Sequence, residues 1–177
     1  MKEKCDTYVG FRTNEFQNKV LPVYMHTDLT NRKPRILLHA CYGPCSTSCV
    51  ERLAFDYDVT VFYYNPNITD QEEYLLRRDN LIKFNDEFKE RTYVNYIEGE
   101  YKVEEFIKVA RPLCNEPEGG KRCDVCFELR LEETGRIASG LGMDYFATAM
   151  AVSPHKDYAS ILRIGESIGA SNNSKFL

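Results

Sequence analysis

The sequence has 177 residues, of which 43% are hydrophobic and 12% aromatic, and this composition is typical of one globular domain with a substantial core. The net charge of −4 excludes a chain that is basic throughout, so any contact with RNA must be focused on a local positive surface. No run reaches the roughly 18 to 20 apolar residues of a membrane span, and the N-terminus lacks a signal-peptide pattern, so we expect a cytoplasmic protein without a membrane contact.

Residues 1–34 are polar and mixed, and we predict that they form a peripheral arm. The apolar run at residues 36–38 is typical of a buried strand. That strand should stop at Cys41, where a Gly-Pro pair forces a turn. A serine or threonine in this turn could cap a helix that starts near Cys49.

Downstream, runs rich in Val, Tyr and Phe alternate with stretches in which apolar residues recur at helical spacing. The further strands that we expect span residues 57–64, 93–97 and 145–151. The helices that we expect span residues 49–55, 70–90, 103–110, 126–141 and 158–168. Strands that alternate with helices favour a single α/β domain over residues 35–177, with a parallel sheet covered by helices on both faces.

Cys41 and Cys45 lie at the first strand-to-helix corner, and Cys123 and Cys126 form a Cys-x-x-Cys pair further along the chain. In an open α/β sheet such a corner lies at the carboxyl end of a strand, where these folds place their ligands. The N–H groups of a helix N-terminus also favour a thiolate over a thiol. The four thiols therefore predict one composite site, for which zinc, an iron–sulfur cluster and a redox dithiol all stay open.

Basic side chains near these motifs are typical of a solvated face. They are Arg77, Arg78, Lys121, Arg122, Arg130 and Lys156. Arg122 and Lys156 differ from the others because they lie at loop ends beside the cysteines, and we predict that they contact phosphate groups. His39, inside the first strand, suits a core histidine as well as a functional one.

Four stretches together carry a specific resemblance. They are Leu-Leu-His-Ala-Cys-Tyr-Gly-Pro-Cys-Ser at residues 37–46, Phe-Tyr-Tyr-Asn-Pro-Asn-Ile at 62–68, Glu-Pro-Glu-Gly-Gly-Lys-Arg-Cys-Asp-Val-Cys-Phe-Glu-Leu-Arg-Leu at 116–131, and Ser-Pro-His-Lys at 153–156. Through them the chain beyond the arm resembles the epoxyqueuosine reductases of the QueH family. The resemblance implies a nucleotide-hydrolase-like (HUP, Rossmann-like) fold. It also implies an iron–sulfur enzyme that removes the epoxide oxygen of epoxyqueuosine at the wobble position of a tRNA anticodon.

The resemblance further implies a set of metal ligands. Cys41, Cys123 and Cys126 would hold a 4Fe-4S cluster, and a second iron stays open. Tyr42 stands where the family has another cysteine, so Cys45 becomes the candidate for the missing ligand. An external electron donor is implied as well, because the reaction is a reduction.

Asp124, inside the Cys-x-x-Cys pair, is the candidate catalytic acid or second-metal ligand. Family chains usually continue into a segment that ends in Cys-Gly-Cys, which we expect to be lacking in this sequence up to Leu177. Two other functions would use the same thiols. One is a zinc-stabilised tRNA-binding module without catalysis, and the other is a redox sensor built on Cys41 and Cys45.

Overall fold

The computed structural model describes residues 32–89, 91 and 93–177, and Lys33–Leu177 forms one compact unit. The arm predicted over residues 1–34 lies outside the described residues except at its last three positions. The strands are β1 (Arg35–Ala40), β2 (Asp58–Tyr63), β3 (Asn95–Glu98), β4 (Tyr145–Thr148) and β5 (Lys175–Phe176). The α-helices are α1 (Gly43–Leu53), α2 (Gln71–Phe88), α3 (Val103–Ala110), α4 (Lys121–Gly140) and α5 (Tyr158–Ser171), and the short 3-10 helices are η1 (Arg111–Leu113) and η2 (Ala149–Val152).

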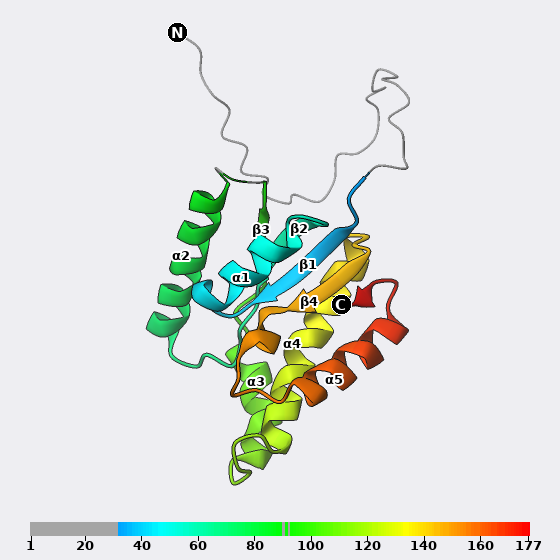
Figure 1. Ribbon diagram of the computed structural model, residues 1–177. Coiled ribbons are helices and arrows are strands. Elements are labelled where there is room, and N and C mark those ends of the chain that lie inside the picture. Colours follow the sequence, from blue (N-terminus) through cyan, green and yellow to red (C-terminus); the bar gives the residue numbers. More distant parts are fainter. Residues whose placement is uncertain (1–31, 90, 92) are drawn as a thin grey trace, which may run out of the picture. The chain divides into compact units, whose positions relative to one another are not determined.

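The strands form one parallel sheet in the order β3-β2-β1-β4-β5, which confirms the predicted α/β fold (Figure 1). β1 is the central strand, and its Leu38 is in register with Val61 of β2 and Ala147 of β4. From β1 the chain first builds outward through β2 and β3, and then adds β4 and β5 on the other side. The carboxyl ends of β1 and β4 therefore border the switch point at which open α/β sheets bind their ligands.

Helices cover both faces of this sheet, as the sequence predicts (Figure 1). Side chains alternate along β1, so Ile36 and Leu38 enter the core that includes Val50 of α1 and Leu81 of α2. Leu37 enters the opposite core, which is formed with α4 and α5. Because β1 is buried on both faces, its apolar residues form a continuous run instead of an alternating pattern.

Helix α1 begins at Gly43, well before the predicted start near Cys49. Pro44 lies in the first turn, where its missing N–H costs little and its fixed φ suits a helix. Ser46 does not cap the helix, because its hydroxyl donates back to a carbonyl one turn earlier at 2.8 Å. Cys45 consequently lies on the helix itself.

Helix α4 begins at Lys121 and not near Cys126, so both cysteines of the Cys-x-x-Cys pair lie in its first two turns. The turn before it contains Gly119 with a φ of 81°, a left-handed conformation that side-chain-bearing residues rarely adopt. This turn lets the chain enter the helix directly at the cysteines.

Two elements beside β1 differ from the sequence prediction. β4 ends at Thr148 and does not extend to residue 151, because the Thr148 hydroxyl oxygen accepts the Met150 N–H at 3.1 Å and starts η2. β5 was not predicted, since two residues are too few for a periodic pattern. Among the residues that the structure describes, no helix is long and apolar enough to cross a membrane.

Candidate functional site

Cys41 directly follows β1 and is partly buried against the core beneath α4 and α5. Burial raises the pKa of its thiol above the ordinary value. The positive charges of Arg130, Lys156 and Arg77 oppose this rise, whereas Cys45 adds to it. The first corner thus brings Cys41 within electrostatic reach of three cations and a second thiol.

His39 lies behind this corner and is completely buried. Its Nε2 lies 2.9 Å from the Tyr64 carbonyl, which can only accept, so this nitrogen carries the proton. Nδ1 then accepts from the Thr148 hydroxyl at 2.9 Å, and the oxygen of that hydroxyl accepts the Met150 N–H. His39 is therefore a core residue that joins the carboxyl ends of β1, β2 and β4 beneath Cys41.

The stability of the protein should depend on the protonation of His39. Burial lowers its pKa to about 3, the charge of Arg130 contributes, and the hydrogen bond to Tyr64 opposes the change. An unfolded histidine takes up a proton below a pH of about 6.5, so between there and about pH 3 the unfolded state binds more protons than the folded state. The His39 contribution should be complete above pH 6.5 and decline on acidification by up to about 1.4 kcal/mol per pH unit.

Chemical denaturation at a series of pH values measures this decline. His39→Gln keeps a donor for the Tyr64 carbonyl but does not titrate, so we expect a shallower dependence below pH 6.5 and a lower stability at pH 7. His155→Gln is the matched control, because His155 is exposed and its substitution should leave the dependence unchanged. If the free energy of unfolding falls equally steeply with pH in His39→Gln and in the starting protein, His39 is not the source of the decline.

Each cysteine of α4 has an N–H group directed at its sulfur. The Gly119 backbone N–H donates to Cys123 Sγ at 3.3 Å, and Arg130 Nη2 donates to Cys126 Sγ at 3.2 Å. Such donors stabilise negative charge on sulfur and are typical of the surroundings of thiolate ligands. The two sulfurs are therefore prepared for a role as anionic ligands.

Arg130 is only 3% exposed, although it carries a full charge. Its Nε donates to the Cys126 carbonyl at 3.0 Å, and its guanidinium lies 5.9 Å from the centre of the Phe127 ring. Within the described part of the chain, no carboxylate forms an ion pair with it. Burying a cation is costly unless polar partners compensate it, and the Cys126 carbonyl and sulfur are the groups that its nitrogens contact.

A pocket of about 150 Å³ opens beside these groups. Its lining includes Arg122, Cys123, Cys126, Phe127, Arg130 and Lys156. Lys156 Nζ lies 5.9 Å from the centre of the Phe127 ring, so a positive charge lies over an aromatic side chain of the pocket wall. Two larger hollows, of about 380 and 470 Å³, are lined by no cysteine. Of these three hollows in the described part of the chain, the small pocket combines sulfur with positive charge.

Three of the predicted site residues lie outside this lining. Cys41 and Cys45 remain at the first corner, where Cys41 is influenced by the same Arg130 and Lys156 that line the pocket. Asp124 has an Oδ2 atom 3.7 Å from Arg163 Nη2, so its carboxylate is paired with α5. Its predicted role as an acid or a ligand stays a prediction.

Among the described residues, no three His, Cys, Asp or Glu side chains converge closely enough to hold a metal ion. The chemistry of the donor set still suits a thiolate-held group. Cys123 and Cys126 accept N–H hydrogen bonds on sulfur, and Cys41 contacts the same core as Cys123. Cys41 and Cys123 thus pack against one core, and Cys123 and Cys126 line one pocket.

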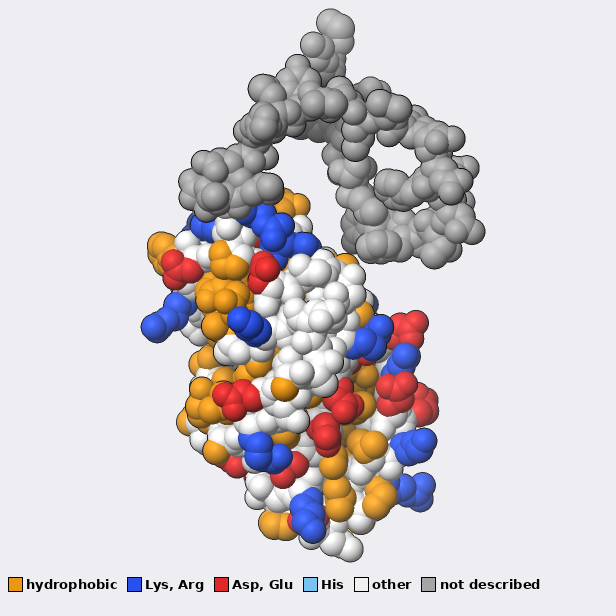
Figure 2. Space-filling view, turned by 90° about the vertical axis from the view of Figure 1, so that its right-hand side faces the viewer, with side chains coloured by type: hydrophobic (Ala, Val, Ile, Leu, Met, Phe, Trp, Pro, Cys, Tyr) orange, Lys and Arg blue, Asp and Glu red, His pale blue; other side chains and the backbone are white. Residues whose placement is uncertain are grey.

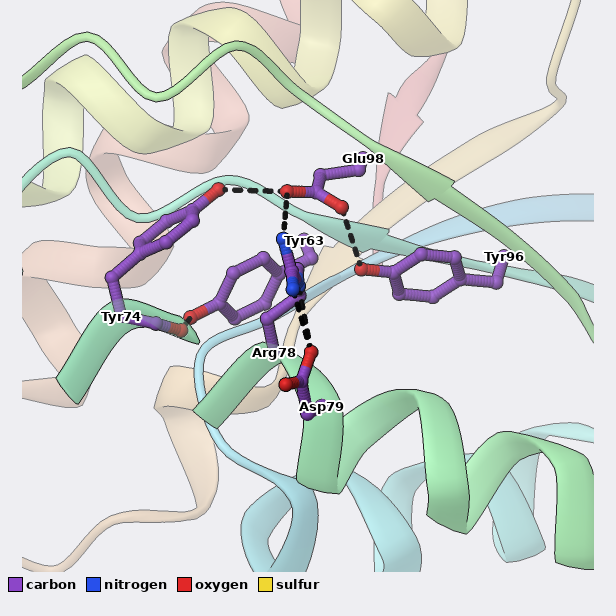
Figure 3. A network of polar contacts seen from close by, with 6 residues as sticks. All are labelled: Tyr63, Tyr74, Arg78, Asp79, Tyr96 and Glu98. Atoms are coloured by element: carbon purple, nitrogen blue, oxygen red, sulfur yellow. Dashed lines mark hydrogen bonds and ion pairs between the residues drawn. The ribbon is translucent and has the colours of Figure 1, made fainter. Parts of the chain in front are cut away.

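A network of tyrosines and one carboxylate holds α2 against β2 and β3 (Figure 3). Glu98 accepts hydrogen bonds from Tyr74 at 3.3 Å and Tyr96 at 3.5 Å, and Arg78 Nη1 lies 4.0 Å from the same carboxylate. The Tyr63 hydroxyl donates to the Tyr74 carbonyl at 2.9 Å. Burial raises the pKa of all three tyrosines, so they remain protonated donors.

Arg77, the neighbour of Arg78 on α2, is held by its own helix, where its Nε lies 2.6 Å from Glu73 Oε1. The Arg77 guanidinium lies 5.6 Å from the centre of the Tyr42 ring, and Tyr42 is 40% exposed. Tyr42 therefore adds an exposed aromatic surface with a cation on it directly beside Cys41.

Two residues of this region were missed by sequence reasoning. Arg130 was expected on a solvated face, but its spacing from Phe127 and Thr134 places it on the buried side of α4. A charged residue within an apolar stripe was the available signal. Asn67 lines the pocket, and the available signals were its Asn-Pro-Asn turn and its place in the stretch 62–68 that carries the resemblance.

Figure 2 shows the distribution of charge on one side of the molecule. Over the lower part of the described surface in this view, acidic and basic side chains are interspersed (Figure 2). Neither sign of charge dominates this part of the surface.

The family model described as epoxyqueuosine reductase QueH matches residues 36–177. Proteins named epoxyqueuosine reductase QueH are similar to the chain: that of Streptococcus pyogenes is 40% identical over 82% of this chain and 58% of its own length, and that of Staphylococcus epidermidis is 41% identical over 82% and 63%. That of Thermotoga maritima is 32% identical over 80% and 71%. The chain thus spans about 60% of the length of the first two relatives.

Proposed function

Because the chain belongs to the epoxyqueuosine reductase QueH family, we propose that it reduces epoxyqueuosine to queuosine at the wobble position of tRNA anticodons. The observation that supports this most directly is the buried Arg130, which donates to the Cys126 sulfur inside a pocket that Cys123 also lines. A reductive site on RNA needs electron-rich sulfur ligands and positive charge together. This pocket combines them.

The cofactor that we infer is a 4Fe-4S cluster. Cys41, Cys123 and Cys126 would hold it, and Cys45 is the candidate fourth ligand. When bound, such a cluster supplies electrons one at a time. The N–H groups that contact the two sulfurs of α4 would orient them and favour their charged form.

The remaining polar residues would bind the substrate and deliver protons. Converting an epoxide to an alkene consumes two electrons and two protons and releases the oxygen as water, so an acid must lie within reach and an external donor must supply the electrons. Asp124 is the acid that we propose. The alternative role of its carboxylate is to bind a second iron. Arg122 and Lys156 line the pocket and would contact phosphates of the tRNA.

Anaerobic purification followed by absorption spectroscopy, metal and sulfide analysis and a turnover assay tests this function. We expect the broad iron–sulfur charge-transfer absorption, bound iron with sulfide, and conversion of epoxyqueuosine in RNA when a low-potential reductant is added. Stoichiometric zinc without iron, RNA binding without turnover, and unfolding on chelation would instead indicate the zinc-stabilised tRNA-binding module.

Arg122→Ala and Lys156→Ala should each weaken tRNA binding. Loss of one phosphate contact reduces counterion release, so the slope of log affinity against log salt should become shallower by about one in each variant. Equilibrium binding at several salt concentrations measures this. Arg136→Ala is the control, because Arg136 is exposed and paired with Glu133 at 2.7 Å. Unchanged slopes in both test variants would place the tRNA contact elsewhere.

A further inference from the structure

Tyr42 places an aromatic ring on the surface directly after Cys41, where β1 gives way to α1. It is the N-cap residue of α1, and its carbonyl accepts the Ser46 N–H at 3.2 Å and the Ser46 hydroxyl at 2.8 Å. These two bonds fix its backbone at the first turn of the helix. Cys41 packs against the core beneath α4 and α5, whereas the Tyr42 ring meets Arg77 of α2. The two neighbours therefore lie on different sides of one corner.

Arg77 holds the Tyr42 ring from one side. Its guanidinium lies 5.6 Å from the ring centre, a distance at which a cation is attracted to an aromatic face. The Arg77 Nε lies 2.6 Å from Glu73 Oε1, one helical turn earlier, so the guanidinium is fixed on α2 and its charge is compensated. Arg77 is consequently better suited to support the ring than to bind a phosphate group.

The rest of the Tyr42 ring is left to solvent. The residue is 40% exposed, and among the described residues no second ring packs on it and no group hydrogen-bonds to its hydroxyl. A ring that is held on one side and wet on the other offers a flat apolar surface. Unpaired nucleobases have a matching surface, and stacking one base on an aromatic side chain contributes about 5- to 150-fold to affinity whatever the base.

The position of this ring relative to the thiols selects which base could reach it. Consecutive Cα atoms lie about 3.8 Å apart, so Tyr42 is adjacent to a residue that we propose as a cofactor ligand. Arg130 and Lys156 exert their positive charges on Cys41 from the other side of the corner. A strand of RNA that brings one nucleotide to the thiols would thus bring the next nucleotide beside Tyr42.

We propose that Tyr42 is a stacking platform for an unpaired base of the RNA, namely the base directly 5′ or 3′ of the nucleotide that is reduced. The inference rests on the proposed function, whose substrate is the single-stranded loop of an anticodon. Sequence-tolerant and sequence-specific proteins alike bind such loops by splaying out bases and stacking them on aromatic side chains. Tyr42 then binds and positions the RNA and takes no part in the chemistry.

Phe55 is the matched control for the loss of an exposed aromatic ring. It is 80% exposed and lies two residues beyond the last residue of α1, whereas Tyr42 precedes the first. The 11 residues of α1 separate the two rings by about 16 Å along the helix axis. Phe55 lines a hollow that no cysteine lines. Its replacement should therefore leave RNA binding unchanged.

The test measures the affinity of the anaerobically purified chain for an anticodon stem-loop RNA with epoxyqueuosine at the wobble position. Two further RNAs carry an abasic residue directly 5′ or directly 3′ of that position. Tyr42→Ala should lower affinity for the complete RNA by about tenfold, and Tyr42→Phe by less than about twofold, because the ring is kept. For one of the two abasic RNAs, Tyr42→Ala should cost less than about twofold, since the base that stacked is already absent.

The salt dependence of binding separates stacking from charge. Stacking releases no counterions, so Tyr42→Ala should keep the slope of log affinity against log salt of the starting protein. Circular dichroism and iron analysis verify that each variant is folded and carries the iron content of the starting protein. A shallower slope in Tyr42→Ala would show that the residue acts through a phosphate contact, which overturns the inference.

Two other results would also overturn it. One is an unchanged affinity in Tyr42→Ala, and the other is the same tenfold loss on the complete RNA and on both abasic RNAs. The proposed function is scored separately by turnover of the starting protein. Turnover without coupling between Tyr42 and a neighbouring base would reject the platform alone, whereas coupling without turnover would reject the reductase activity and keep the platform.

Discussion

Cys123→Ser and Cys126→Ser are each expected to lose most of the bound iron. The rate of epoxyqueuosine reduction should fall by more than about 100-fold in each variant. Replacing a residue that only hydrogen-bonds to a metal ligand commonly lowers metal affinity or activity by about 10- to 100-fold. A hydroxyl is in addition a poor substitute for a thiolate on iron. Both side chains line the pocket, and both sulfurs accept N–H hydrogen bonds. Iron and sulfide analysis of anaerobically purified variants, together with the turnover assay, measures the loss.

Cys114→Ser is the control for this pair, because Cys114 is exposed and follows η1 away from the pocket. It should retain iron and activity. Cys45→Ser should lower the iron content by a smaller amount if Cys45 supplies the ligand that Tyr42 cannot. A Cys126→Ser variant with its full complement of iron would remove Cys126 from the ligand set.

Arg130→Met is expected to lower the free energy of unfolding by about 3 kcal/mol. Removing one partner of a buried charge pair leaves the other uncompensated, which typically costs 3 to 5 kcal/mol. Here the partner would be the Cys126 sulfur, 3.2 Å from Arg130 Nη2, in the thiolate form that it would take as a metal ligand. If that sulfur were neutral, a methionine of similar length would replace the guanidinium at little cost. Urea denaturation under anaerobic conditions measures the difference.

A double-mutant cycle identifies the source of that cost. In a Cys126→Ala background the arginine has lost its sulfur partner, so adding Arg130→Met should be neutral or stabilising, and the coupling energy should be about 3 kcal/mol. Arg136→Met on the exposed side of the same helix should change stability by less than about 0.5 kcal/mol. An equal cost of Arg130→Met in both backgrounds would mean that Arg130 acts by packing on Phe127 and not through the sulfur.

The fold could be predicted to a large extent from local patterns. The run at residues 36–38 is apolar on both sides because β1 is covered on both faces, and the helical spacing over residues 70–90 matches α2 closely. The predicted first residues of α1 and α4 were wrong, and the reason is local. Glycine and proline were taken as the end of regular structure, whereas here they form the first residues or the cap of a helix.

The sequence by itself determined which thiols the chain offers, because the identities of Cys41, Cys123 and Cys126 and their motifs are independent of packing. Only the tertiary structure decided which other residues meet them. Arg130 and Asn67 are far apart along the chain, and only the structure shows that burial removes water from the charge of one and from the amide oxygen of the other. The cost of that desolvation depends on every element packed around the group, which no local pattern of residues records.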